Sequence, residues 1–184
     1  MLSLKNGRNE ESEFLLVRRK CIRQTVRRRT KRYVEEKGTQ LVNYLFTRVP
    51  LERMICLFDG GGEVIFVFVR RRNEGKITTT HFNQLREHFE TEFVDRDEVE
   101  QVFQTEDQIT DSWDLIENHS INSTDAILLQ CALDRTNELR IEGDNLVLVS
   151  SDKRLLRAAQ NEGLLTFNPE TDGQTALDVL IDPP

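Results

Sequence analysis

The sequence predicts an α/β fold, a three-layer α/β/α domain with a mostly parallel central sheet. Short apolar runs, such as Met54–Phe58 and Leu146–Val149, have the length of buried strands rather than of helices. Longer segments with apolar residues at helical spacing separate these runs. Strands that alternate with helices in this way form a largely parallel sheet with helices on both faces.

In the first half of the chain the pattern predicts helices at 39–46, 63–72 and 80–90 and a strand at 54–58. Three glycines after Asp59 favour a tight turn from this strand into the helix that begins at Glu63 and stops at Gly75. No Gly-Lys-Ser/Thr follows them, which argues against a phosphate-binding loop. His81 and His88 are expected at the surface of the third helix.

In the second half the expected elements are a strand at 92–94 or 99–103, helices at 107–118, from 125 and from 152 to 163, and strands at 146–149 and 164–167. The helix at 107–118 carries the only tryptophan, Trp113, which we expect in the core. Gly163 is expected to close the last helix. The order is thus helix, strand, two helices, strand, two helices, strand, helix, strand.

Composition limits the class of protein. A chain of 184 residues fits one domain with a substantial core. Its three cysteines have no metal-type spacing, which indicates reduced thiols in a cytoplasmic protein and argues against zinc. No apolar run has the roughly 18 to 20 residues that a membrane-spanning helix needs. We therefore expect a soluble, cytoplasmic protein without membrane contact.

Charge is distributed unevenly along the chain. Residues 1–32 hold 11 Lys/Arg against 3 Asp/Glu, so the remaining residues hold 25 − 11 = 14 against 32 − 3 = 29. We expect an atypical basic leader at 1–30, in which residues 14–17 are the only candidate strand, one domain at 31–170 and a flexible acidic tail at 171–184. An acidic body argues against broad nucleic-acid binding by charge alone.

Three acids stand at expected helix starts, namely Glu63, Asp125 and Asp152. Ligand sites of open parallel sheets lie at the carboxyl ends of the strands, where these helices begin. Carboxylates that meet there suit a hard divalent cation, Mg²⁺ or Mn²⁺, which can activate water for attack on a phosphodiester. The alternative is structural, because Asp is a preferred N-cap and acids in a first helical turn stabilise the helix dipole.

Several motifs resemble a known family. The motifs are Ser123-Thr-Asp-Ala-Ile-Leu-Leu129, Leu148-Val-Ser-Ser-Asp-Lys-Arg-Leu-Leu-Arg-Ala-Ala159 and Asn168-Pro-Glu170, with Gly62-Glu-Val64 and Lys31-Arg-Tyr-Val-Glu-Glu-Lys-Gly38 before them. They are similar to PIN-domain ribonucleases, especially VapC-type toxins of toxin–antitoxin pairs. The resemblance implies metal-dependent RNA cleavage, a small antitoxin partner and a possible homodimer.

By this resemblance Glu63, Asp125 and Asp152 match three acidic positions of the metal site and are the expected catalytic residues. The basic residues Arg70, Arg71, Arg72, Lys153 and Arg154 could contact substrate phosphates; alternatively, they are solvated residues at a helix end and a helix start.

One position departs from the family pattern. The first aspartate of the family aligns with Thr25, in a run of arginines that fits poorly at a strand-to-helix turn. A reading-frame shift over residues up to about 30 would explain this departure. The alternative is genuine divergence to a catalytically impaired binding module that engages an antitoxin-like protein or RNA. A phosphate-accepting receiver domain is disfavoured, because no Asp pair follows a first strand.

Overall fold

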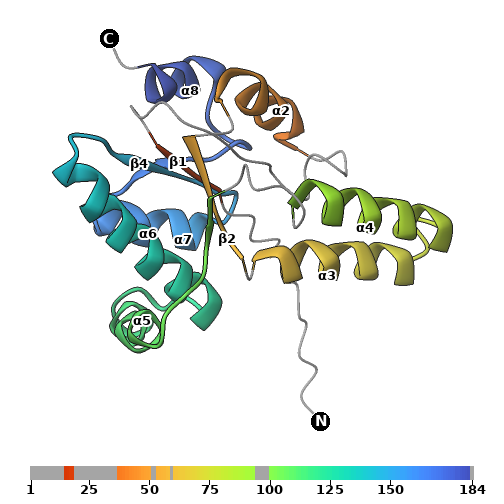
Figure 1. The fold of residues 1–184 in the computed structure, drawn as a ribbon, viewed down its shortest axis with the longest axis horizontal. Helices are drawn as coiled ribbons and strands as arrows, with labels where there is room; N and C mark the ends of the chain where they lie inside the picture. The colour runs from red at the N-terminus through yellow and green to blue at the C-terminus, as the bar shows by residue number, and fades with distance from the viewer. Residues whose placement is uncertain (1–14, 19–36, 51–52, 59, 94–99, 183–184) are drawn as a thin grey trace.

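The protein has an α/β fold in the computed structural model, which describes residues 15–18, 37–50, 53–58, 60–93 and 100–182 (Figure 1). The described elements are β1 (Leu15–Arg18), α2 (Thr39–Arg48), β2 (Met54–Leu57), α3 (Gly60–Asn73), α4 (Thr79–Phe93), β3 (Glu100–Val102), α5 (Glu106–His119), α6 (Ser123–Ile141), β4 (Leu146–Val149), α7 (Lys153–Asn161), β5 (Leu165–Phe167) and α8 (Gln174–Ile181). The predicted α/β class is confirmed, and from α2 to β5 the order is the predicted one. Thr25 and most of the expected basic leader lie outside the described residues.

The five strands form one sheet in the order β3-β2-β1-β4-β5. The pairs β2/β3 and β4/β5 are parallel, whereas β1 is antiparallel to both of its neighbours. Because β2 and β4 both oppose β1, four of the five strands point the same way. The expectation of a mostly parallel sheet therefore holds for these four strands and is wrong for the central one.

The direction of β1 is not encoded in its composition. Its sequence, Leu-Leu-Val-Arg, suits a buried strand, and the backbone of such a strand can form parallel or antiparallel ladders. In this fold Leu16 pairs with Ile55 on one side and with Leu148 on the other. The candidate strand at 14–17 in the expected leader thus corresponds to the centre of the sheet.

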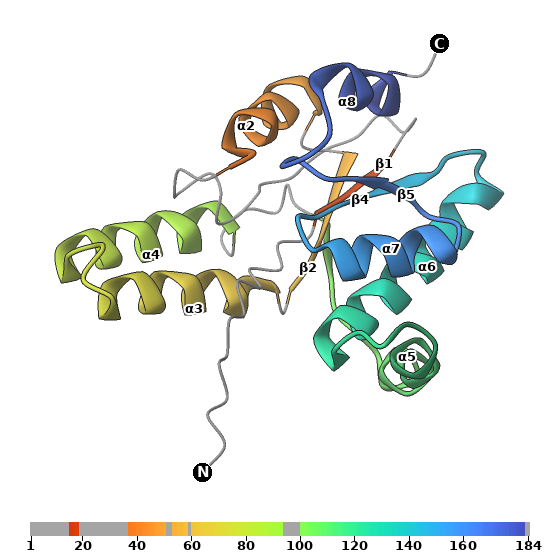
Figure 2. The same ribbon diagram turned by 180° about the vertical axis from the view of Figure 1, so that it is seen from behind.

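Side chains of β2 and β4 alternate between two hydrophobic clusters. Cys56 and Val149 point into the first cluster, which α2, α3, α4 and α8 complete. Ile55 and Leu148 point into the second, which α5, α6 and α7 complete. Figures 1 and 2 show α2 with α8 on one side of the sheet and α6 with α7 on the other. Burial on both faces explains why β2 and β4 are uniformly apolar.

The acidic end of the chain forms a helix rather than the expected flexible tail. In α8, Leu177 and Ile181 are buried against the first cluster. Acids in and just after α8 find partners on α2, since the Tyr44 hydroxyl donates to Asp178 at 2.8 Å and Arg48 pairs with the C-cap residue Asp182 at 3.1 Å. The tail prediction is therefore wrong for residues 174–181, because tertiary contacts order this segment.

Gly38, at the start of α2, lies close to the backbone of the segment that follows β5. Its φ of +87° lies in the left-handed region, which favours glycine. A Cβ atom at this position would lie 2.7 Å from the carbonyl oxygen of Pro169, just after β5. The close approach of these two backbone segments therefore requires glycine.

Trp113 lies at the surface, contrary to the prediction that it belongs to the core. Its exposed fraction is 58%, whereas Leu115 on the same helix is 6% exposed. The inner face of α5 is set by Ser112 and Leu115, which are both buried, and Trp113 falls outside that face. None of the helices in the described ranges is long and apolar enough to cross a bilayer.

Candidate functional site at the carboxyl edge of the sheet

The carboxyl edge is the side of the sheet where β2, β3, β4 and β5 end, at Leu57, Val102, Val149 and Phe167. The parallel pairs β2/β3 and β4/β5 flank β1 in the sheet, and ligands of open parallel sheets bind outside the carboxyl ends of the strands. Helices α3 and α7 begin at this edge because they directly follow β2 and β4 (Figure 1). Helix α6 ends where β4 begins, so its start points towards the same side.

Asp152 follows β4 and caps α7, as the sequence predicts. Its Oδ1 atom accepts hydrogen bonds from the backbone N–H groups of Arg154 at 2.7 Å and Leu155 at 2.9 Å. The Ser150 hydroxyl accepts a hydrogen bond from the backbone N–H of Asp152 at 3.0 Å, which fixes the turn. Asp152 is 9% exposed. Both capping bonds use Oδ1, so the cap does not occupy the second oxygen.

Asp125 lies in the first turn of α6 and is almost completely buried, with an exposed fraction of 1%. The helix is capped by Asn122, whose side-chain oxygen accepts from the Asp125 backbone N–H at 2.9 Å. The Asn122 amide also donates to Asp125 Oδ2 at 2.6 Å. A buried carboxylate at a helix start is stabilised by the exposed N–H groups and by the helix dipole.

Glu63 lies in the first turn of α3 and is half-buried. The turn before it depends on the backbone, since the Phe58 carbonyl accepts from the Gly61 N–H at 2.9 Å. Helix α3 therefore begins with three glycines, and Glu63 follows them in its first turn. Asp59, which stands between Phe58 and the start of α3, is outside the described residues.

The predicted ligands do not form a three-residue metal group. Among the described residues, no three Asp, Glu, His or Cys side chains lie together in a way that could hold a metal ion. Mg²⁺ is commonly held by one or two protein carboxylates and keeps several water molecules. The oxygen-only donors of Glu63, Asp125 and Asp152 thus fit Mg²⁺ or Mn²⁺ by their chemistry.

Two groups of basic residues lie at different distances from the acids. Arg70, Arg71 and Arg72 are at the far end of α3, roughly 10 Å or more along the helix from Glu63. Two of these arginines contact the α3–α4 hairpin, since Arg72 covers the Phe82 ring at 4.5 Å and Arg70 lies 3.9 Å from Glu74. Lys153 and Arg154, by contrast, begin α7 directly beside Asp152.

An aromatic pair at the carboxyl edge was missed by the sequence analysis. Phe58 follows β2 and Phe103 follows β3, and their rings stack with centroids 4.7 Å apart. Phe103 is 61% exposed. Because β2 and β3 are parallel neighbours, the residues that follow the two strands lie close together. A phenylalanine at the end of each expected strand was therefore the signal in the sequence that could have revealed this pair. An exposed ring of this kind can stack with an unpaired nucleobase.

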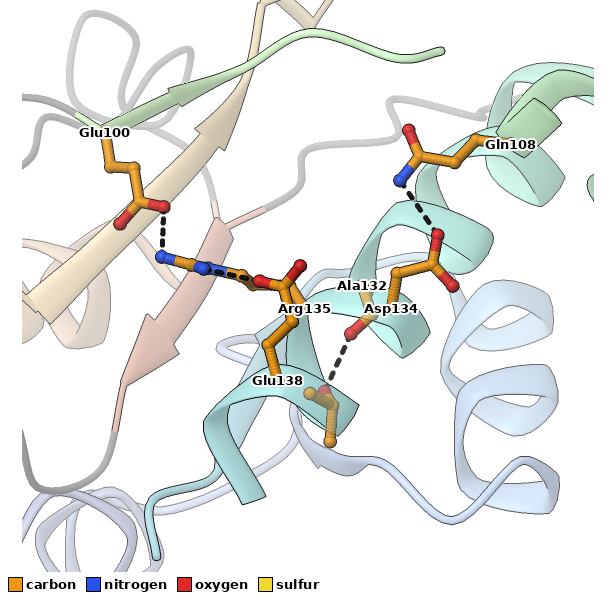
Figure 3. A network of polar contacts seen from close by, with 7 residues as sticks. Glu100, Gln108, Ala132, Asp134, Arg135 and Glu138 are labelled. Atoms are coloured by element: carbon orange, nitrogen blue, oxygen red, sulfur yellow. Dashed lines mark hydrogen bonds and ion pairs between the residues drawn. The ribbon is translucent and has the colours of Figure 1, made fainter. Parts of the chain in front are cut away.

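A polar network fixes α6, the helix that carries Asp125 (Figure 3). Arg135 forms ion pairs with Glu100 of β3 and, at 2.5 Å, with Glu138. Burial acts to lower the pKa of Arg135, but the hydrogen bond to Glu138 and the charge of Glu100 outweigh it, so the pKa is raised. Gln108 of α5 donates to Asp134 at 2.8 Å. These contacts hold α6 between β3 and α5.

Comparison with models of known protein families found no match, and neither the curated proteins nor the solved structures compared with this chain gave one. The likeness to PIN-domain ribonucleases therefore rests on the sequence motifs alone. The functional assignment that follows depends on those motifs and on the chemistry of the carboxyl edge.

Proposed function

We propose that this protein is a PIN-domain endoribonuclease of the toxin type, which hydrolyses RNA phosphodiesters with the help of Mg²⁺ or Mn²⁺. The observation that carries the proposal is the pair of carboxylates Asp125 and Asp152, which are 1% and 9% exposed and stand at two helix starts. The sequence motifs around both residues support it. A three-layer PIN-like arrangement, a small antitoxin and a homodimer are parts of the same proposal.

Within this proposal, Asp125, Asp152 and Glu63 hold the cation. A divalent cation bound there would acidify a water molecule and stabilise the charge that develops on the phosphate. Asn122 orients Asp125 through the 2.6 Å hydrogen bond to Oδ2. The cap bonds to Oδ1 orient Asp152, so that its second oxygen can face a ligand.

Because residues 33–184 are acidic overall, contacts with RNA must depend on a few side chains near the site. Lys153 and Arg154 supply positive charge next to Asp152, and the exposed ring of Phe103 offers a stacking surface that needs no charge. Both features favour single-stranded RNA, whose bases are free to stack.

Cleavage of single-stranded RNA with and without Mg²⁺ or Mn²⁺ tests the proposal. Asp152→Asn should abolish metal-dependent cleavage while keeping the fold, because Asn is as good an N-cap as Asp. The matched control is Asp144→Asn, which changes a buried Asp just before β4, at the opposite edge of the sheet. Equal cleavage by wild-type protein and Asp152→Asn, or equal loss in Asp144→Asn, would contradict the proposal.

The second candidate is a catalytically silent PIN-fold module that binds an antitoxin-like protein or RNA. The observation that favours it is Thr25, which stands where the family has its first aspartate. A silent module should bind single-stranded RNA or its partner without cleaving RNA in either metal, and binding should persist in Asp152→Asn. Metal-dependent cleavage by the wild-type protein would exclude it.

A further inference from the structure

Helix α5 presents an apolar stripe to solvent, made of Ile109, Trp113 and Ile116. Residues four and seven positions apart lie on one face of a helix. Trp113 is 58% exposed and Ile109 36% exposed, whereas Ile116 is partly buried against the second hydrophobic cluster, where the stripe meets the core. An exposed tryptophan with apolar neighbours is the usual anchor of a protein interface.

The inner face of α5 is fully engaged, so the stripe sits on a fixed support. Gln108 and Thr105 form a capping box at the start of the helix. Gln108 also bonds to Asp134 of α6, and at the other end His119 lies 2.6 Å from Glu162, just after α7. Anchors on a fixed helix lose little conformational entropy on binding.

Helix α5, which carries the stripe, is acidic. Helix α5 contains five acids, Glu106, Asp107, Asp111, Asp114 and Glu117, and no Lys or Arg. Two of them border the stripe and form its rim: Glu106 precedes Ile109 by three residues, and Glu117 follows Trp113 by four. At 100° per residue, Asp111 falls on the opposite flank of the helix.

This charge pattern decides which occupant fits. A second copy of the chain would bring two acidic rims together, and RNA would meet acids of its own sign, so both are disfavoured. We propose that the α5 stripe is a docking surface for a basic amphipathic helix of another protein, with apolar residues on Trp113 and Ile109 and Lys or Arg on the rim. Helices bind in this mode through anchors spaced four and seven residues apart.

A synthetic peptide of Leu and Lys, about 18 residues long so that it can form a helix, serves as the probe. One version places all Leu on one helical face, and a scrambled version has the same composition. Trp113 is the only tryptophan, so its emission should shift to shorter wavelength with the amphipathic peptide alone. Anisotropy of the labelled peptide measures the affinity for full-length variants.

We expect Trp113→Ala to weaken binding about tenfold or more and Trp113→Phe to weaken it less. The matched control, Phe66→Ala, removes another exposed aromatic residue, on α3, and should have no effect. Glu117→Lys should weaken binding about threefold at low salt, whereas Asp111→Lys should not. Circular dichroism checks that each variant is folded.

Several outcomes would overturn the proposal. These are equal binding of the scrambled peptide, equal effects of the two Lys substitutions, and a Phe66→Ala effect as large as that of Trp113→Ala. Self-association of the chain that Trp113→Ala abolishes would show instead that the occupant is a second copy. None of these measurements depends on RNA cleavage, so the docking proposal and the nuclease proposal can fail separately.

Discussion

The strand-to-helix units β2–α3 and β4–α7 both carry an acid at a helix start, but they form the turn by different means. After β4, the side chain of Asp152 makes the turn, because its carboxylate caps α7. After β2, the turn contains a backbone hydrogen bond from the Gly61 N–H to the Phe58 carbonyl, and Glu63 lies inside the first turn of α3. Asp152 is therefore both the N-cap of its helix and a functional candidate, whereas Glu63 is a functional candidate that is not an N-cap.

This difference matters for the assignment of function by mutation. Loss of activity in an Asp152 variant is informative only if the replacement keeps the cap, as Asn does. Glu63 lies inside the first turn of α3, so its replacement does not have to preserve a cap. In both units the helix body is held by the core, so differences between the units should appear at the turns and ends.

The largest expected effects come from the two helix bodies and should be similar. Phe68 of α3 and Leu155 of α7 are both completely buried, and Phe68 also packs edge-to-face on Phe89 with centroids 6.3 Å apart. We expect Phe68→Ala to lower the free energy of unfolding by about 3–5 kcal/mol and Leu155→Ala by about 2–5 kcal/mol. Urea unfolding measures both, and Phe66→Ala, at an exposed position of α3, should change it by less than about 0.5 kcal/mol. A small effect at either buried position would show that its unit is not anchored by the core.

The turns should separate the two units. Asp152→Ala should lower the free energy of unfolding by about 1 kcal/mol through loss of the cap, and Asp152→Asn should leave it nearly unchanged. Glu63→Ala should cost less, about 0.5 kcal/mol, because an acid in the first turn stabilises the helix dipole but is not the cap. Thermal unfolding monitored by circular dichroism ranks the three variants. If Glu63→Ala were as destabilising as Asp152→Ala, the proposed difference between the turns would be wrong.

The smallest expected effect lies at the end of α3. The hydrogen bond from Lys76, at 2.7 Å, lowers the pKa of Glu74 below its ordinary value of 4.5 and outweighs the opposing effect of desolvation. A lowered carboxyl pKa stabilises the fold above about pH 4.5, and this stabilisation is lost as the pH falls through the folded-state pKa. Wild type should therefore be slightly more stable than Glu74→Gln above about pH 4.5, and the difference should disappear as the pH falls through the folded-state pKa. Urea unfolding of both proteins across this range measures it, and a difference that persisted at low pH would have another cause.

Local pattern was enough to predict most of the fold. The four apolar residues Leu146–Val149 become a strand buried on both faces, and the Ser-Ser-Asp that follows becomes the predicted cap of α7. These features could be predicted because each depends on neighbours in the sequence, through periodicity or through capping. The helix starts that carry Asp125 and Glu63 were found for the same reason.

Features that depend on distant partners could not be predicted. The acids of α8 made it resemble a solvated tail, but Tyr44 and Arg48 of α2 bind them. Trp113 was expected in the core because it is large and apolar, but Ser112 and Leu115 determine which face of α5 is buried. The direction of β1 and the distances among Glu63, Asp125 and Asp152 depend on tertiary arrangement, which sequence periodicity does not encode.

The contact between Gly38 and Pro169 has a consequence for how the sequence can vary. A clash between two side chains can be relieved by rotation about a bond, but a Cβ at residue 38 would press on a main-chain oxygen that cannot rotate away. Even alanine would force α2 and the chain after β5 apart. Homologues with this fold should therefore keep glycine at this position, whereas the residue type at exposed positions nearby, such as Gln40 on α2, should vary.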